Sequence, residues 1–314
     1  MRAVRIESFG GPEVLQVVEV PEPVPGPDEV VADVRAAGVN YADTHAVEDS
    51  YLSRQALPLI PGGEVILDLP GGRALGMAAS GGYAQRVAVN PARLIGVPDG
   101  ISDGQALSCL VQGASAWHLL RTSAHLRPGE TVVVHAAAGG VGTLAVQLAA
   151  LWGAGRVIAT ASTPAKRELA LSLGADAAVD STEPELAQAL RAANDGRRVD
   201  VVLEMTGGAV FDQSLAALAP FGRLVCYGMA GRIPPTAVQP AALMAHSTAV
   251  IGFWLAHAGE AMLAEAVTDL FELILAGKLS PVLGPGYPLD RVADAHRALR
   301  SRQSTGKLIL LPNG

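Results

Sequence analysis

The chain has few cysteines, no long apolar run and little positive charge. Its 314 residues include only two cysteines, Cys109 and Cys226, which lie far apart among apolar neighbours. This count excludes a disulfide framework and a cysteine-ligated zinc site, so we expect two small buried side chains. No segment approaches the roughly 18 consecutive apolar residues of a membrane span, and the N-terminus MRAVRIESFG lacks the apolar core of a signal peptide. These absences predict a cytoplasmic protein with no membrane partner.

The charge balance excludes another class of partner. The formal net charge is −7, and only 17% of the residues are charged while 50% are hydrophobic. A nucleic-acid surface needs clustered Lys and Arg, so we do not expect nucleic acid as a partner. A chain of this length and apolarity can bury more than one core, which predicts two domains.

The stretch 131–150, TVVVHAAAGGVGTLAVQLAA, has the pattern of a strand, a tight turn and a helix. Its β-branched start is typical of a buried parallel strand. Ala137, Gly139 and Gly142 then follow at the spacing of the small residues in a dinucleotide-binding turn, where the backbone bends sharply and approaches a pyrophosphate. The N–H groups of the following helix would face that phosphate. The residues predicted to contact it are Ala138, Gly139, Gly140, Val141 and Gly142.

The next strand, 156–160, ends without the Asp or Glu that binds the ribose hydroxyls in NAD-preferring folds. Ser162, Lys166 and Arg167 follow it instead. One hydroxyl and two cations would hold a 2′-phosphate, which predicts NADPH as the cofactor. The alternative is that the two cations only solvate a helix face.

The rest of the chain indicates an α/β fold in which two regions differ in their pattern of predicted strands and helices. Residues 1 to about 100 carry short apolar runs broken by Pro and Gly, typical of antiparallel strands, and show no long helix. Residues 102–122 have a helical pattern. From 131 to 253 strands and helices alternate, which predicts a doubly wound parallel sheet with helices on both faces. A long helix at 261–276, a Pro-rich loop, a short helix at 291–300 and a strand at 307–311 complete the chain.

Several blocks in the same order resemble the medium-chain dehydrogenase/reductase superfamily, and within it the zinc-free quinone oxidoreductases related to zeta-crystallin. The blocks are AAGVNYADT at 36–44, IPGGEV at 60–65, GGYAQRVAV at 81–89, QGASAWHLL at 112–120, VVVHAAAGGVGTLAVQLA at 132–149, TPAKRELALSLGAD at 163–176 and STGKLILLP at 304–312. The resemblance implies a GroES-like β-rich catalytic domain, 1–113 with 256–314, and a Rossmann NADPH-binding domain, 114–255. It also implies a nicotinamide in the cleft between them.

The resemblance implies hydride transfer without zinc. The zinc-dependent members of the superfamily carry a Cys/His/Glu set and a four-cysteine lobe, whereas residues 1–100 here contain one histidine, His45, and no cysteine. The acceptor would be a conjugated carbonyl, namely a quinone, an enone or an enoyl thioester, with negative charge building on its oxygen. The segment between 65 and 80 is also shorter than in relatives, which predicts that the barrel lacks one hairpin that the relatives have.

Three candidate catalytic residues lie between 40 and 51. Asn40 matches the family asparagine that lines the nicotinamide pocket, although an Asx turn is the alternative. His45 replaces a tyrosine found in many quinone reductases and would either donate a proton or pack. Tyr51 falls where enoyl-thioester reductases have a proton-donating tyrosine, the alternative being a packed edge residue. Asp43 is expected to tie a loop.

Further cofactor contacts follow from the resemblance. Ser115 stands where the family usually has threonine near the nicotinamide, and Arg302 matches an arginine that reaches the cofactor phosphates. Loops at the carboxyl ends of strands would supply the others, because dinucleotides bind at that edge of a sheet. These residues are Thr206, Gly228, Phe253 and Leu255.

Three functions remain open from the sequence. The first is an NADPH-dependent quinone or enone reductase, the second an enoyl-thioester reductase of fatty-acid or polyketide synthesis, and the third a non-catalytic NADPH-binding protein. The strand 248–253 is apolar and last in its sheet, so in a monomer it would be an exposed sheet edge, which proteins usually avoid. This predicts a homodimer paired through that strand, as the resemblance also implies.

Overall fold

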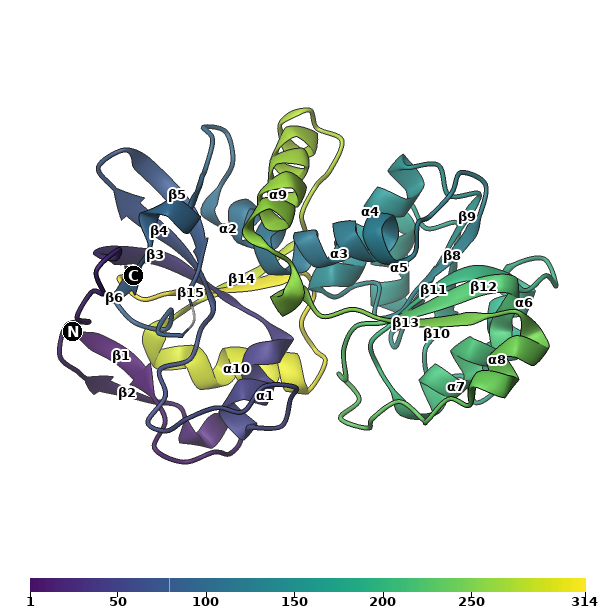
Figure 1. The fold of residues 1–314 in the computed structure, drawn as a ribbon, viewed down its shortest axis with the longest axis horizontal. Helices are drawn as coiled ribbons and strands as arrows, with labels where there is room; N and C mark the ends of the chain where they lie inside the picture. The colour runs from purple at the N-terminus through teal and green to yellow at the C-terminus, as the bar shows by residue number, and fades with distance from the viewer. Residues whose placement is uncertain (79) are drawn as a thin grey trace. The chain divides into compact units, whose positions relative to one another are not determined.

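The computed structural model describes residues 1–78 and 80–314 and divides into two compact units. The first unit comprises Met1–Val111, Glu260–Gly277 and Pro281–Gly314, and the second comprises Gln112–Gly259 and Lys278–Ser280. Figure 1 shows a β-rich part made from both ends of the chain and a part in which helices and strands alternate. The predicted domain limits at 113/114 and 255/256 stand near the unit limits at 111/112 and 259/260.

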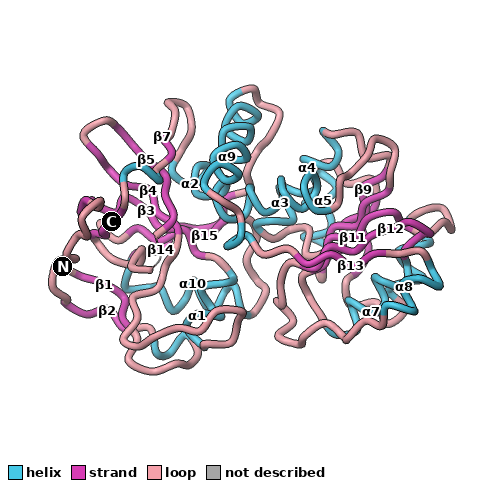
Figure 2. The backbone as a smooth tube through the Cα atoms, viewed as in Figure 1, coloured by secondary structure: helices cyan, strands magenta, loops and turns pink. Residues whose placement is uncertain are grey.

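The second unit is built on a parallel sheet of six described strands in the order β10-β9-β8-β11-β12-β13. All four residues of β8 are buried, as the β-branched run predicts. Figure 2 draws the strands of this sheet in magenta and the helices beside it in cyan. The doubly wound parallel sheet is thereby confirmed. The strands are β8 (Thr131–Val134), β9 (Arg156–Ala161), β10 (Ala177–Asp180), β11 (Val199–Glu204), β12 (Leu218–Cys226) and β13 (Ala249–Gly252).

Helices cover both faces of this sheet (Figure 1). Leu186, Leu190 and Phe211 pack on one face against Val133 and other strand residues to form a core. Figure 1 shows α4 and α5 on the other face. The helices are α3 (Ala114–His118), α4 (Gly140–Leu151), α5 (Pro164–Ser172), α6 (Leu186–Ala193), α7 (Gly208–Ala217) and α8 (Pro240–His246).

The first unit contains a mostly antiparallel sheet in the order β14-β15-β3-β4-β5-β7, with β6 paired to β3, and a separate β1–β2 pair. Strands β4 and β5 form a hairpin across the segment predicted to be short. The predicted β-rich domain is confirmed. Its strands are β1 (Arg2–Arg5), β2 (Gln16–Glu19), β3 (Val30–Val39), β4 (Glu64–Leu69), β5 (Gly72–Met77), β6 (Arg86–Val89), β7 (Ile95–Gly96), β14 (Leu283–Pro288) and β15 (Lys307–Leu311).

Helices complete the first unit and the start of the second. The helices of the first unit are α1 (Tyr41–Glu48), α2 (Asp103–Leu107), α9 (Glu260–Leu275) and α10 (Val292–Arg300). Short 3-10 turns lie at Pro12–Val14, Pro91–Arg93, Leu255–His257 and Leu289–Arg291. The helical pattern at 102–122 is confirmed, but two π-helical segments, Ser108–Gly113 and Leu119–Ser123, interrupt it. Among the described residues we find no helix with the length and apolarity needed to cross a membrane.

Three elements were not predicted from the sequence. Helix α1 lies within the first 100 residues and has eight residues, so it is compatible with the expectation of no long helix there, but its position was not predicted. Strand β14 occupies the segment predicted as a Pro-rich loop. Within residues 1–78 and 80–314 it pairs with β15 alone, at the edge of the sheet, and a sheet edge tolerates proline. Helix α8 was not predicted, because the apolar residues of its sequence, PAALMAH, are consecutive and show no amphipathic helical spacing; none of its residues is buried.

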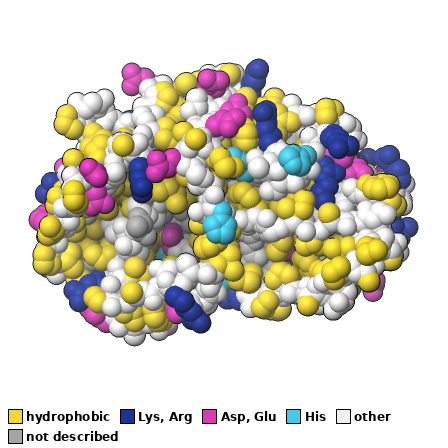
Figure 3. All heavy atoms as spheres, viewed as in Figure 1, with side chains coloured by type: hydrophobic (Ala, Val, Ile, Leu, Met, Phe, Trp, Pro, Cys, Tyr) yellow, Lys and Arg dark blue, Asp and Glu magenta, His cyan; other side chains and the backbone are white. Residues whose placement is uncertain are grey.

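Both signs of charge are spread over the surface in view. Figure 3 shows Lys and Arg side chains interspersed with Asp and Glu on the face drawn there. Hydrophobic side chains cover much of the area between them.

Candidate functional site

The predicted cofactor residues of the second unit gather at one edge of its sheet. The turn at 138–142 follows β8, Ser162 follows β9, and Thr206 follows β11. Gly228 and Phe253 come after β12 and β13. Because all six strands are parallel, these positions share the carboxyl edge of the sheet, where dinucleotides bind in such folds.

The turn after β8 requires small residues for a steric reason. A Cβ on Gly142 would lie 2.3 Å from the Ala136 carbonyl oxygen and 2.7 Å from the Ala137 Cα, which are backbone atoms; a Cβ on Gly140 would meet only the end of the Gln112 side chain, which can move. Ala136 itself adopts a left-handed backbone conformation with φ of 47°. Gly139 is the N-cap of α4, so the first N–H groups of that helix, including that of Val141, point out of the turn beside Ala138.

The groups predicted for the 2′-phosphate have different surroundings. Ser162 is exposed, and Lys166 lies in the first turn of α5, where its N–H donates to the N-cap Thr163. The Arg167 guanidinium donates to Asp180 over 2.7 Å and to the Ala161 carbonyl over 3.1 Å. Asp180 ends the neighbouring strand β10, and sequence reasoning missed it because the carboxylate comes from a different strand.

Glu204 is a buried acid at this edge that the sequence reasoning did not single out. It ends β11, and its Oε1 accepts the N–H groups of Thr206 over 2.6 Å and Gly207 over 3.0 Å. Its side chain is fully buried, which raises the pKa of the carboxyl, while the backbone N–H groups oppose that rise. The same loop needs glycine at 207, where φ is 81° and a Cβ would meet the Ile233 carbonyl oxygen at 2.0 Å. Glu204 therefore shapes the loop that carries Thr206.

The remaining cofactor candidates occupy both units. Ser115 is buried in α3, and Leu255 begins the 3-10 turn that follows β13. The Phe253 ring stands 6.3 Å from the His118 ring, within the same unit. Arg302 belongs to the first unit, where it is exposed after α10 with a left-handed φ of 54°.

In the first unit, Asn40 lies at the centre of a buried polar cluster. It is the N-cap of α1 in a capping box with Asp43, which ties the chain there as expected for Asp43. The Asn40 Nδ2 donates to Glu64 over 3.1 Å, and its Oδ1 accepts from the Lys307 ammonium over 2.9 Å. Lys307 also forms an ion pair with Glu64, and both side chains are fully buried. Asn40 thus has the local capping role that was the alternative in the sequence analysis, and its contact with a bound molecule stays a prediction.

Asp43 extends this cluster toward α10. Its carboxylate accepts hydrogen bonds from the Asn40 N–H over 2.7 Å and from the Tyr83 hydroxyl over 2.9 Å. The Tyr83 hydroxyl also lies 3.3 Å from Nε2 of His296. Burial raises the pKa of Asp43 to about 6, against the lowering effect of these hydrogen bonds. Burial likewise lowers the pKa of His296 to about 4.

His45 and Tyr51 lie together. Their rings stack at 4.9 Å with an angle of 23°, and the Tyr41 ring meets His45 edge-on at 5.5 Å. Nδ1 of His45 lies 2.8 Å from the Ser50 hydroxyl, and His45 is only 3% exposed. The structure therefore contains the packed arrangement for both residues, while proton donation by either stays a prediction.

Comparisons with known proteins decide the family. A family model described as zinc-binding dehydrogenase matches residues 140–272. The chain is 30% identical to the human quinone oxidoreductase, with 99% of this chain and 98% of the relative covered. It is 32% identical to the quinone oxidoreductase of Pseudomonas aeruginosa, with 99% of each covered. The chain belongs to the quinone oxidoreductase family of the medium-chain dehydrogenase/reductase superfamily.

Solved quinone oxidoreductases share the fold of the chain. The enzyme from Thermus thermophilus, whose structures include a complex with NADPH, is 40% identical with a TM-score of 0.87, covering 99% of this chain and all of that one. The Escherichia coli quinone oxidoreductase complexed with NADPH is 30% identical with a TM-score of 0.92 over the same shares. The resemblance inferred from the sequence blocks is confirmed.

The description of the family model directs attention to metal ligands. Among residues 1–78 and 80–314 we find no group of three or more His, Cys, Asp or Glu side chains that could hold a metal ion. His45, the one histidine among residues 1–100, lies among tyrosine rings and beside Ser50.

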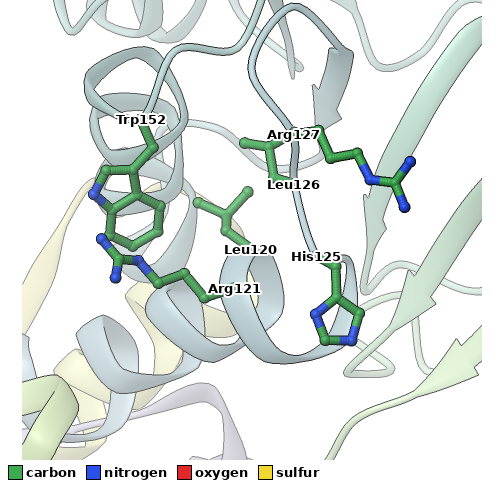
Figure 4. Close-up of a pocket in the computed structure, with 6 residues that line it drawn as sticks. All are labelled: Leu120, Arg121, His125, Leu126, Arg127 and Trp152. Carbon is green, nitrogen blue, oxygen red and sulfur yellow. The ribbon is translucent and has the colours of Figure 1, made fainter.

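The second unit also has a surface hollow of about 560 Å³, lined by Leu120, Arg121, His125, Leu126, Arg127 and Trp152 (Figure 4). It is lined by residues that precede β8 or follow α4, which places it at the amino edge of the sheet. The Arg121 guanidinium stacks 4.2 Å from the Trp152 ring, and Figure 4 shows the Arg127 side chain directed away from that ring. The size of the hollow suits a ligand, but the strand ends that carry the dinucleotide turn are at the opposite edge.

Proposed function

We propose that the chain is an NADPH-dependent oxidoreductase that transfers hydride to a quinone or another α,β-unsaturated carbonyl. The observation that carries this proposal is the turn after β8, where a Cβ at Gly142 would collide with backbone atoms of Ala136 and Ala137. Such a turn brings the start of α4 close to the end of β8, so that the first N–H groups of the helix can bind a pyrophosphate. The NADPH complexes of the Thermus thermophilus and Escherichia coli relatives support the choice of cofactor.

The residues present fit the cofactor as follows. The N–H groups at the start of α4 would hold the pyrophosphate, and Ser162 with Lys166 would hold the 2′-phosphate. Arg167 contributes less to that site, because Asp180 already neutralises its charge. When bound, NADPH supplies the hydride at its nicotinamide ring.

The acceptor side would be formed by Asn40, His45 and Tyr51. Hydride addition to a conjugated carbonyl builds negative charge on the carbonyl oxygen, and a hydrogen-bond donor aimed at that oxygen lowers the barrier. The Asn40 amide is held by buried charged groups, whereas the His45 and Tyr51 rings stack on each other. We assign electrostatic stabilisation to Asn40 and shaping of the acceptor pocket to the two rings.

The cofactor half is tested by binding. Isothermal titration should give a tighter dissociation constant for NADPH than for NADH. Lys166→Ala should weaken NADPH binding about tenfold, equal to about 1.4 kcal/mol, and leave NADH binding unchanged. Arg191→Ala, at an exposed position on α6, is the matched control and should change neither constant. Equal affinity for the two cofactors, or an unchanged preference in Lys166→Ala, would contradict the phosphate site.

The acceptor half is tested by a substrate panel of quinones, enones and an enoyl thioester with NADPH. We expect quinone turnover, and Tyr51→Phe should leave it nearly unchanged because the reduced quinone oxygens can take protons from water. Tyr287→Phe, a half-buried phenol on β14, is the matched control. A large loss of enoyl reduction in Tyr51→Phe alone would instead favour the enoyl-thioester reductase. No oxidation of NADPH by any acceptor would favour the binding protein.

Three further proposals accompany this function. The reaction needs no zinc, so the purified enzyme should keep its quinone turnover after chelation and contain no stoichiometric metal. Strand β13 lies at the edge of its sheet, which supports pairing of two chains along it, and sedimentation of Ile251→Lys against the parent chain would test this homodimer. A cytoplasmic location stays a prediction for cell fractionation.

A further inference from the structure

The amide of Asn40 has a single orientation that its neighbours dictate. Lys307 can only donate, and its ammonium reaches Oδ1 over 2.9 Å. An ionised Glu64 can only accept, and it receives Nδ2 over 3.1 Å. A flipped amide would place Nδ2 against the ammonium and Oδ1 against the carboxylate. The Glu64–Lys307 pair therefore fixes which end of the amide faces which way.

The chain makes special provision for this pair. Both side chains are fully buried, although burying charges is costly unless their partners are well placed. Gly38 on β3 leaves the space for them, because a Cβ there would lie 1.9 Å from Oε2 of Glu64 and 2.8 Å from Nζ of Lys307. Strand β3 pairs with both β4 and β15, which start with Glu64 and Lys307.

The second oxygen of Glu64 serves another backbone segment. Its Oε1 accepts the Val111 N–H over 2.8 Å. Val111 lies within the π-helical segment Ser108–Gly113 and is the last residue of this part of the first unit. One carboxylate thus holds both the start of α1 and a π-helical turn, and such turns are frequent at functional sites.

We propose that Glu64 and Lys307 are positioning residues that present Asn40 to the acceptor as a hydrogen-bond donor. The Oδ1 atom is engaged by the ammonium and by the capping box, so the bond that the amide adds to a bound carbonyl is donated by Nδ2. Such a donor stabilises the oxygen on which charge develops during hydride addition. This inference rests on the proposed function, and the experiments below separate the two.

The kinetic test is a double-mutant cycle. Asn40→Ala should lower kcat for quinone reduction about 100-fold, as loss of one such donor does. Lys307→Met alone leaves a buried unpaired carboxylate, so the pair is removed together as Glu64→Gln with Lys307→Met. This double variant should lower kcat at least tenfold with an unchanged dissociation constant for NADPH. Adding Asn40→Ala to it should lower kcat by no more than about threefold further, because the donor is already misplaced.

Multiplicative effects in this cycle would overturn the proposal, since the pair would then act independently of Asn40. An unchanged kcat in Asn40→Ala would overturn it as well. The matched control is the half-buried pair of Arg73 with Asp103 in the same unit, joined over 2.7 Å. Replacing it by Arg73→Met with Asp103→Asn should leave the full effect of Asn40→Ala intact.

A second readout does not depend on turnover. The side-chain amide signal of Asn40 in NMR, identified by its loss in Asn40→Ala, should exchange slowly with D₂O in the parent protein and at least tenfold faster in the Glu64→Gln/Lys307→Met variant. Equal exchange in the two would overturn the positioning role. If the parent chain turns over none of the acceptors, the proposed function fails, and this exchange measurement decides alone whether the pair holds the amide.

Discussion

His135 gives the sharpest prediction about stability, because its imidazole is buried neutral inside the second unit. It follows β8 and is 1% exposed. Its Nδ1 lies 2.8 Å from the Thr160 hydroxyl and its Nε2 lies 2.7 Å from the Ser214 hydroxyl. A neutral imidazole has one donor nitrogen and one acceptor nitrogen, and one hydroxyl can accept from the first while the other donates to the second. Neither partner is a carboxylate that would stabilise the charged imidazolium. Burial lowers the pKa of His135 from 6.5 to about 4.

The sign of the effect follows from proton binding. Between pH 4 and 6.5 the unfolded chain holds a proton on His135 and the folded chain does not, so stability falls as the pH drops through this window. Each pKa unit corresponds to about 1.4 kcal/mol. The shift from 6.5 to about 4 therefore makes the folded state about 3 kcal/mol more stable at pH 7 than below both pKa values, as far as this one group is concerned. Inside the window, the slope from this one group approaches about 1.4 kcal/mol per pH unit.

Tryptophan fluorescence isolates the unit that matters. All three tryptophans, at 117, 152 and 254, lie in the second unit. Urea unfolding from pH 4.5 to 7.5 should show that His135→Gln loses about 1 kcal/mol less per pH unit than the parent chain between pH 6 and 5. His246→Gln, at an exposed histidine of the same unit, is the control and should follow the parent chain. Identical pH dependence of the parent chain and His135→Gln would refute the reasoning.

Three other substitutions probe the second unit. Gly142→Ala brings a Cβ to 2.3 Å from a backbone carbonyl oxygen, so the affinity for NADPH should fall at least tenfold in titrations, which equals about 1.4 kcal/mol. The control is Gly259→Ala, which has open space around it and should keep the affinity. Arg223→Lys loses the two-point contact with Glu130, whose two bonds are each 2.6 Å, and should cost about 1–2 kcal/mol in urea unfolding. Phe211→Ala empties a core position that is 1% exposed and should cost about 3–5 kcal/mol; a loss below 1 kcal/mol would contradict the packing described.

The parallel sheet could be predicted because its signals are local. The run at 131–134 is apolar in every residue after Thr131, and glycine follows it at the spacing of a turn. Elements that depend on distant partners were harder to predict. Strand β14, LGPGYP, has a loop composition and becomes a strand only through pairing with β15. Helix α1 is short and has a weak pattern, so its formation depends on its capping box and its contact with α10.

The candidate site divides in the same way. Residues that follow strands, such as Thr206 and Gly228, could be placed at one edge of the sheet from their order in the chain. Partners joined across the fold could not be predicted. Asp180 meets Arg167 from the neighbouring strand, and Lys307 meets Glu64 although 243 positions separate them in the sequence. The sequence pattern shows where a charged residue stands in the chain, but it does not show which distant residue the fold brings next to it.

Asn40 shows why two interpretations of one residue need not compete. The capping box uses Oδ1, and donation to a substrate would use Nδ2, so the same side chain can start α1 and act on the acceptor. Asn40→Ser separates the two tasks, because serine is a good N-cap but has no amide N–H. We expect this variant to be about 1 kcal/mol more stable than Asn40→Ala and to share its loss of kcat. A serine variant with the kcat of the parent chain would show that the residue matters for quinone reduction only as a cap.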